Sequence, residues 1–200
     1  MSVKALILAQ TKGGALKLLP IILLFAGSLL IGQGTYIKAK ATFAQVLLER
    51  AWQETVDTGQ ITKAWPWADT FPVAAIEVLG RSKGRIIALD GSSGEALAFA
   101  PGHLHNTAKP GQRGTAVYAA HRDTHFAFLK DAAKGDVIEV VDRLGAKHRY
   151  QIEHMRIAPW DQSGITLDDS VKRIALVTCW PFDAKTPGPL RYIVEGSLIE

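Results

Sequence analysis

Seven short runs rich in strand-forming residues follow one another after Pro72, and their spacing constrains the fold of this chain more than any other feature. Turn residues, mostly Gly, Pro, Asp and Ser, separate the runs, for example at 90–94 and 187–189. The helical stretches between them are short, whereas a parallel sheet needs longer crossovers. The pattern therefore predicts a mainly β fold, a small barrel or sandwich of seven or eight strands with short helices. The predicted strands are 73–79, 85–90, 115–121, 136–142, 148–157, 173–179 and 191–198, and the predicted helical turns are 96–100, 126–133 and 167–171.

The N-terminal part of the chain contains 20 residues without a charged side chain, 18–37. At 1.5 Å per residue, this length spans a hydrocarbon core of about 30 Å. No polar face interrupts the run, so we predict a transmembrane helix rather than the buried helix of a soluble protein. Lysines flank the segment on both sides: Lys4, Lys12 and Lys17 before it, Lys38 and Lys40 after it. By the positive-inside tendency, the short N-terminal side stays in the cytoplasm and the rest of the chain is exported.

A cleaved signal peptide shares the basic start and the apolar core of this segment, and it is the main alternative. The triplet Ala39-Lys40-Ala41 has the form of a cleavage site, but it lies late and follows a lysine. We therefore expect an uncleaved anchor.

Four parts follow from these patterns: a short cytoplasmic N-terminus, 1–17; the anchor, 18–37; a membrane-proximal helix, 38–59; and the exported domain, 60–200. The third part is free of Gly and Pro up to Val56 and rich in helix formers. Phe43, Val46, Leu47 and the segment 50–52, which includes Trp52, place apolar groups at helical spacing, which predicts an amphipathic helix that ends at Gly59.

The composition excludes several classes of function. The chain has 23 Lys and Arg against 19 Asp and Glu, a net charge of +4, and its basic residues form no long run. Nucleic acid is therefore not an expected partner. A single cysteine excludes an internal disulfide and any Cys-rich metal site.

That cysteine, Cys179, ends the apolar run 174–179, and Trp180-Pro181 follows it abruptly. A strand end where a loop begins is a common place for a reactive group. A lone thiol also packs well as a small hydrophobe, and both interpretations stay open on this residue alone. An exported, exposed thiol is a chemical liability, and a reactive one needs a base or a positive neighbour.

His121 is the best-placed candidate base, because it ends the predicted strand 115–121 and opens the polar loop 121–126. The other histidines are less well placed. His103 and His105 lie in a stretch rich in Gly and Pro, and His148 and His154 fall in an alternating strand where surface positions are expected. The spacings His103-x-His105 and His121-x-x-x-His125 lack a third ligand in a fixed motif, so we expect no metal and no other cofactor.

Arg191 opens the last predicted strand. It is either a solvated strand-end charge or an anion-binding group. If it faces Cys179, its fixed donors can stabilise a tetrahedral oxyanion and favour the thiolate. Thr178 and Asp123 are second-line candidates for supporting or substrate-binding contacts. Each signal is weak alone, but the order His, Cys, Arg with all three at strand ends makes a stronger pattern.

Together these residues resemble the sortases, membrane-bound transpeptidases with a T-L-x-T-C strand end, an arginine on the next strand and an upstream histidine. Residues 175–179 read A-L-V-T-C, so four of the five positions agree and Ala175 replaces the first threonine. The histidine block is similar to residues 118–123, and Arg191 fits the family's arginine. The lead-in 66–73 and the segment 179–183 are similar to the sortases found in Gram-negative bacteria.

The resemblance covers roughly residues 60–200 and implies an eight-stranded β-barrel with Cys179 as nucleophile, His121 as proton-transfer partner and Arg191 as oxyanion stabiliser. It implies a thioester acyl-enzyme and a membrane-tethered protein substrate with an LPxTG-like C-terminal signal, cut after the threonine. An amine acceptor, or water, then takes the acyl group. With the anchor, it implies a single-pass protein of the inner (cytoplasmic) membrane whose catalytic domain lies on the outer, periplasmic side.

Two other classes of cysteine enzyme fit less well. L,D-transpeptidases carry a Ser-His-Gly-Cys block, which is absent, and here 57 residues separate His121 from Cys179. Papain-like amidases place Cys before His, the reverse of this chain. The alternative from another class is a membrane-tethered β-domain that binds a partner and merely buries Cys179.

Overall fold

The computed structural model describes residues 3–81, 84–168 and 170–200, with side chains from Leu18 onward. It divides into two units, Met1–Phe43 and Ala44–Glu200, and each is considered by itself. The predicted cytoplasmic segment, 1–17, begins with residues that lie outside the described ones.

A single helix, α1, runs over Val3–Thr58 and contains both the predicted anchor and the predicted membrane-proximal helix. Within the apolar run, Ser28 and Thr35 donate their hydroxyl protons to the carbonyl oxygens of Leu24 and Ile31, at 2.8 Å each. These polar side chains are therefore satisfied inside the helix, as a lipid environment requires. Of the described residues, Leu18–Thr58 form a helix long and apolar enough to cross a membrane, by length and composition.

The last turns of α1 belong to the second unit and pack on its barrel. Ala44, Leu48, Ala51, Trp52 and Thr55 are buried, at the three- and four-residue spacing of one helix face. Trp52 contacts Ala75 and Ile87 of the barrel wall. The apolar face predicted for this end was partly wrong, because Phe43 is 62% and Val46 45% exposed.

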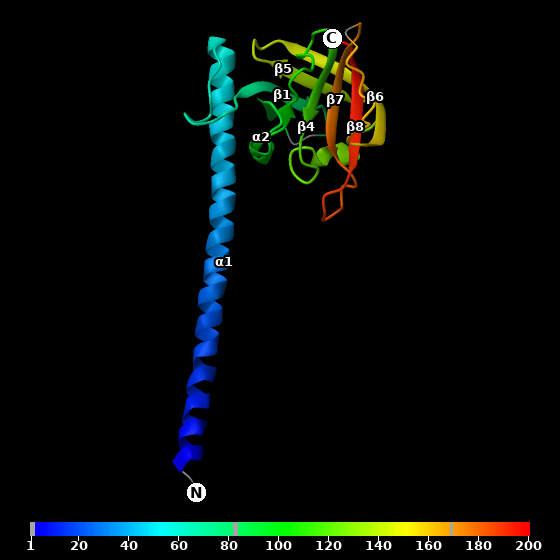
Figure 1. The fold of residues 1–200 in the computed structure, drawn as a ribbon. Helices are drawn as coiled ribbons and strands as arrows, with labels where there is room; N and C mark the ends of the chain where they lie inside the picture. The colour runs from blue at the N-terminus through cyan, green and yellow to red at the C-terminus, as the bar shows by residue number, and fades with distance from the viewer. Residues whose placement is uncertain (1–2, 82–83, 169) are drawn as a thin grey trace. The chain divides into compact units, whose positions relative to one another are not determined.

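Across the described part of the second unit, eight strands close into a barrel in the order β1-β2-β3-β4-β7-β8-β6-β5 (Figure 1). The strands are β1 Pro72–Val78, β2 Ile86–Asp90, β3 Gly102–His103, β4 Gly114–Ala119, β5 Val137–Asp142, β6 Lys147–Pro159, β7 Lys172–Cys179 and β8 Leu190–Leu198. Alternate residues of these strands, such as Ala116 and Tyr118 of β4, form most of the core inside the barrel, and Phe126 and Leu129 add to it.

Seven of these strands coincide with the predicted ones to within two residues, and the eight-stranded barrel that the family resemblance implied is confirmed. The eighth, β3, was missed because two residues are too few to show alternation. Helix α2, Gly94–Phe99, and the 3-10 helix η1, Ala127–Asp131, lie where helical turns were predicted. The third prediction, 167–171, was wrong for its described residues, which are not helical: the backbone N–H and the hydroxyl of Ser170 donate to the Asp168 carboxylate.

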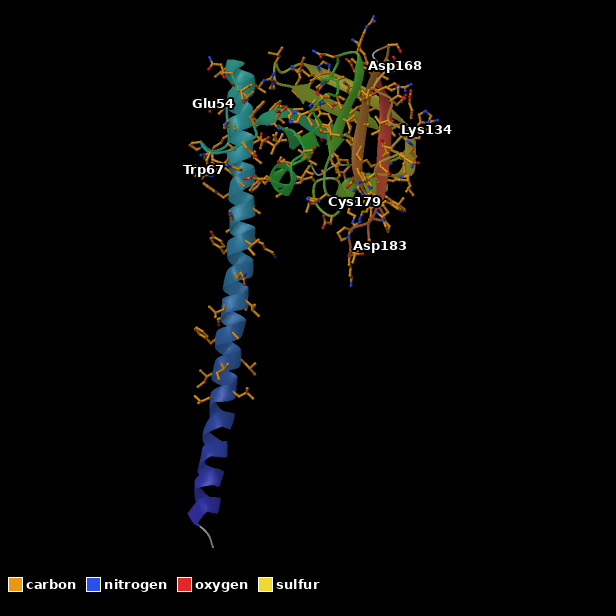
Figure 2. The ribbon with its side chains drawn as sticks, in the orientation of Figure 1. Glu54, Trp67, Lys134, Asp168, Cys179 and Asp183 are labelled. Carbon is orange, nitrogen blue, oxygen red and sulfur yellow. The ribbon has the colours of Figure 1, made fainter. Side chains whose placement is uncertain are left out.

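Strand directions determine where the site lies. β4 runs parallel to β7, and β8 runs antiparallel to β7. The ends of β4 and β7 and the start of β8 therefore meet at one end of the barrel. Figure 2 labels Cys179 at this end and Asp168, which precedes β7, at the other.

Candidate active site

Cys179 is the last residue of β7, a strand whose residues 174–176 are fully buried in the barrel. Its thiol is free and half-buried. On the neighbouring strand β8, Arg191 is its direct partner in the antiparallel register, and Tyr192 is the partner of Thr178. Backbone pairing thus holds Cys179 and Arg191 opposite each other.

His121 reaches the same end of the barrel through β4. In the parallel register Ala119 lies beside Val177, and the Ala120 amide donates to the Val177 carbonyl at 3.1 Å. His121 lies two residues after Ala119, and Cys179 lies two residues after Val177. The His121 side chain is exposed, so it is open to a substrate.

Thr178 joins the two strands just before the site. Its side chain is buried, and its hydroxyl donates to the Ala120 carbonyl at 2.7 Å. This bond fixes the spacing of β4 and β7 at the point from which His121 and Cys179 emerge. Thr178 therefore acts on the scaffold of the site.

The guanidinium of Arg191 is half-buried and is held by local carbonyl oxygens. Its Nη1 donates to Gly188 at 2.8 Å and to Leu190 at 2.9 Å. Within the described part of the chain, no hydrogen bond uses its Nη2 or Nε. One side of the group is thus oriented and the other keeps donors for a ligand.

Asp123 is not brought into this arrangement. Its side chain is exposed and makes no hydrogen bond or ion pair with any described residue. The neighbouring turn is closed by the Phe126 amide, which donates to the His121 carbonyl at 3.1 Å.

An aromatic cluster beside Cys179 was missed as part of the site. Trp180 stacks on Tyr192 with ring centroids 5.6 Å apart and planes at 26°, and Phe182 meets both rings edge-on. Burial raises the pKa of Tyr192. The succession Cys-Trp-Pro-Phe was visible in the sequence, but the contact with Tyr192 depends on the β7–β8 register.

Arg122 is a second residue that sequence reasoning passed over. Its Nη2 donates to the carbonyl oxygens of Ala184 and, at 3.1 Å, Thr186. Both belong to the connection 180–189 between Cys179 and Arg191. The polar character of the loop after His121 is apparent in the sequence, but the partners of Arg122 are backbone atoms that leave no sequence pattern.

His125 lies near His121 and the end of α2. Burial lowers its pKa, and the charge of His121 lowers it further, while a bond to the Phe99 carbonyl opposes the shift. His125 is therefore neutral at pH 7. Among the residues with described positions, no group of three or more His, Cys, Asp or Glu side chains gathers at metal-binding distance.

The remaining histidines have structural surroundings. His103 lies in β3, where it is buried, donates to the Ala108 carbonyl at 2.9 Å and packs on Tyr118. Burial lowers its pKa. His148 was expected at the surface, but its side chain is only 19% exposed and lies 3.0 Å from the Asp142 carboxylate. His154 is exposed, as predicted.

Comparison with known proteins agrees with this geometry. The family model of the sortase domain matches residues 75–199. The chain therefore belongs to the sortase family, and it is a cysteine transpeptidase.

Among individual relatives, the chain is similar to sortase D of Bacillus subtilis (strain 168), with 26% identity over 196 residues, 92% of this chain and 98% of the relative. A Clostridium perfringens sortase D5 transpeptidase has the same fold, with 24% identity, a TM-score of 0.61, and coverage of 80% of this chain and 99% of that one. Sortase C1 of GBS Pilus Island 1 is 26% identical with a TM-score of 0.57, over 64% of this chain and 65% of that one.

Proposed function

We propose that this chain is a membrane-anchored sortase that cleaves an LPxTG-like C-terminal signal through a thioester on Cys179 and transfers the acyl group to an amine, or to water. The observation that carries the proposal is the pairing of Cys179 with Arg191 across β7 and β8. A cysteine transpeptidase needs a thiol nucleophile, and Cys179 is the single cysteine of the chain. The nucleophile therefore sits opposite a guanidinium that has free donors.

The chemistry proceeds in two halves. The Cys179 thiolate attacks the threonine carbonyl of the signal, and the free N–H groups of Arg191 donate to the oxyanion that forms. The C–N bond then breaks, and His121 gives its proton to the departing glycine amine. In the second half, an incoming amine attacks the thioester, His121 takes up the amine's proton, and the thiolate leaves.

The N-terminal helix supports the proposal that the enzyme is anchored in a membrane. It is of the kind that anchors a protein in a membrane or serves as a signal sequence. As an uncleaved anchor, 18–37 makes this a single-pass protein of the inner (cytoplasmic) membrane, with 1–17 in the cytoplasm and the catalytic domain, 60–200, exported. A substrate tethered to the same bilayer meets the enzyme at a raised effective concentration.

The periplasmic location depends on the likeness of 66–73 and 179–183 to the sortases of Gram-negative bacteria, which stays a prediction. Labelling intact cells with a membrane-impermeant maleimide tests the export of Cys179. Protection of the thiol in intact cells, with reaction after permeabilisation, would contradict the proposed orientation.

The activity is tested with the full chain in detergent micelles and a peptide that contains Leu-Pro-x-Thr-Gly. We expect release of the glycine-led fragment, an acyl-enzyme detected by mass spectrometry, and faster turnover with an added amine. Cys179→Ala should abolish both the fragment and the adduct without lowering the Tm. Cleavage that persists in Cys179→Ala would overturn the proposal.

A further inference from the structure

The connection 180–189 leaves β7 directly after Cys179 and enters β8 just before Arg191. Its conformation therefore affects both groups of the proposed site. At its far end, Arg191 donates to Gly188 and Leu190. In its middle, Ala184 and Thr186 are held by Arg122, which lies 62 and 64 residues away in sequence.

Arg122 is itself firmly positioned. Arg122 directly follows His121. Ala120, the residue before His121, donates its amide N–H to Val177 and accepts a hydrogen bond from Thr178 at its carbonyl oxygen. One guanidinium thus links the strand end that carries His121 to the connection between Cys179 and Arg191. It makes this link through two hydrogen bonds from Nη2 to backbone oxygens.

The energetics of Arg122 argue against a role in stability alone. In the described part of the chain it has no carboxylate partner, and its buried Nη1 has no hydrogen-bond partner at all. A buried N–H group without an acceptor lowers the stability of the folded state. An apolar side chain of similar length would avoid this cost, yet it would leave Ala184 and Thr186 untethered.

From these contacts we infer that Arg122 is a positioning residue, which holds the connection 180–189 so that Cys179 and Arg191 face His121 in a productive geometry. The inference rests on the proposed function, because it assigns Arg122 a task in that same site. It acts through the backbone of the connection and needs no contact with substrate.

The connection 180–189 contains a trypsin site, Lys185, whose cleavage reports on its local opening. Lys185 is exposed and lies between the two residues whose carbonyl oxygens Arg122 binds. Trypsin cleavage after Lys185 needs local opening of the connection. The rate of this cleavage therefore measures the tether without any reference to catalysis.

The experiment compares the full-length protein in micelles with Arg122→Met, Arg122→Lys and the control Arg149→Met. Arg149 lies in β6 and is paired with Glu139 and Glu200, so its replacement alters charge pairing but not the connection. Cleavage at Lys185 is followed by mass spectrometry, peptide cleavage by kcat and KM, and folding by Tm.

For Arg122→Met we expect cleavage at Lys185 to become several-fold faster and kcat to fall by about tenfold, a size that small misplacement of reacting groups can reach. KM and Tm should change little. Arg122→Lys should recover part of both losses, because its ammonium donates to carbonyl oxygens too. Arg149→Met should leave the cleavage rate and kcat at the wild-type value.

An unchanged rate of Lys185 cleavage, or an unchanged kcat, in Arg122→Met would overturn the inference. If Arg122→Met fails to fold, Arg122→Lys decides: wild-type behaviour in both assays again overturns it, whereas an intermediate loss in both supports it. The two proposals can fail separately. If the wild-type protein cleaves no peptide but Arg122→Met still speeds cleavage at Lys185, the proposed function is refuted, whereas the role of Arg122 in holding the connection 180–189 is supported.

Discussion

Several charged residues on β5 and β6 form ion pairs, whereas Arg122 and Arg191, at the barrel end that holds Cys179, have no carboxylate partner among the described residues. Glu139 accepts from Arg149 at 2.9 Å and lies 3.3 Å from the Lys147 ammonium. Arg149 also bonds to Glu200, and Arg156 pairs with Glu195. At the other place, the hydrogen bonds that Arg122 and Arg191 make with described residues all go to backbone carbonyl oxygens.

The two regions differ in whether a carboxylate neutralises the guanidinium: Arg149 and Arg156 have such a partner, and Arg191 has none among the described residues. On the paired strands the ions offset each other: the hydrogen bond from Arg149 lowers the pKa of Glu139, which keeps that carboxylate ionised. Such surface pairs contribute little to stability. A guanidinium without a carboxylate neighbour keeps its positive charge for a ligand, and a developing oxyanion is the ligand that the proposed reaction supplies.

The largest effect is expected from Arg191→Ala. Loss of its donors should lower kcat/KM for peptide cleavage by about 10²-fold or more, the usual size for a lost oxyanion donor. Folding should be intact, because Arg191 is half-buried and its own bonds are to the adjacent turn. The measurement is steady-state kinetics beside a thermal melt.

Arg149→Ala on the paired strands is the matched control for Arg191→Ala, and its rate should equal that of the wild type. A wild-type rate in Arg191→Ala would remove Arg191 from the mechanism. A comparable loss in Arg149→Ala would erase the contrast between the two regions.

A smaller effect is expected from Thr178→Val, which removes the hydroxyl that bonds to Ala120. The buried Ala120 carbonyl then lacks its partner, which should lower the free energy of unfolding by about 1–3 kcal/mol. Because the bond fixes β4 against β7, kcat should fall by about tenfold as well. Chemical denaturation and peptide kinetics measure the two losses.

Thr70→Val is the control for Thr178→Val. Thr70 is also buried, and its hydroxyl bonds to the Asp90 carbonyl at 2.7 Å, at the end of the barrel where β1 begins. A similar loss of stability is expected, with kcat retained. Equal losses of kcat in both variants would mean that stability alone explains the result for Thr178.

The fold could be read from the sequence largely because its strands are local patterns. Alternating apolar residues and turn residues define seven strands to within two residues, and each pattern needs only its own segment. β3 was not predicted, because it has two residues and is recognised as a strand by its hydrogen bonds to β2 and β4 rather than by a sequence pattern. The buried face of the α1 end was partly wrong for the same reason: the β1–β2 wall around Ala75 and Ile87 selects Trp52 and leaves Val46 outside.

The candidate site was predictable only in part. The strand-end positions of Cys179, His121 and Arg191 made them candidate site residues, and the family resemblance predicted their roles. The β7–β8 register and the stacking of Trp180 on Tyr192 required the structure. Arg122 could not have been found from its sequence neighbours, because its partners are carbonyl oxygens that every residue has.

A part of the pH dependence of stability is expected to come from the buried histidine His103. Burial lowers the pKa of His103 below its ordinary value of 6.5. Below pH 6.5 the unfolded chain therefore binds more protons than the folded one, and stability falls as the pH decreases toward the lowered value. Well above pH 6.5 His103 is neutral in both the folded and the unfolded chain, and this loss of stability is absent.

Thermal melts between pH 7.5 and 5.5 measure this fall in stability. His103→Gln should make the fall smaller, because an amide still donates to Ala108 but does not titrate. His154→Gln, at an exposed position of β6, should leave the fall as it is in the wild type. An unaltered pH dependence in His103→Gln would assign the effect to His125, whose pKa burial also lowers.

The smallest effect is expected from Asp123→Asn. Its carboxylate is exposed and unpaired among the described residues, so removal of the charge breaks no contact. We expect kcat/KM to change by less than about twofold, within the usual range for surface substitutions. The contrast with Arg122, its chain neighbour, is sharp, because Arg122 uses backbone bonds that Asp123 lacks. A loss of tenfold or more would show that the carboxylate reaches His121 or the substrate during turnover, and Asp123 would then belong among the residues of the site.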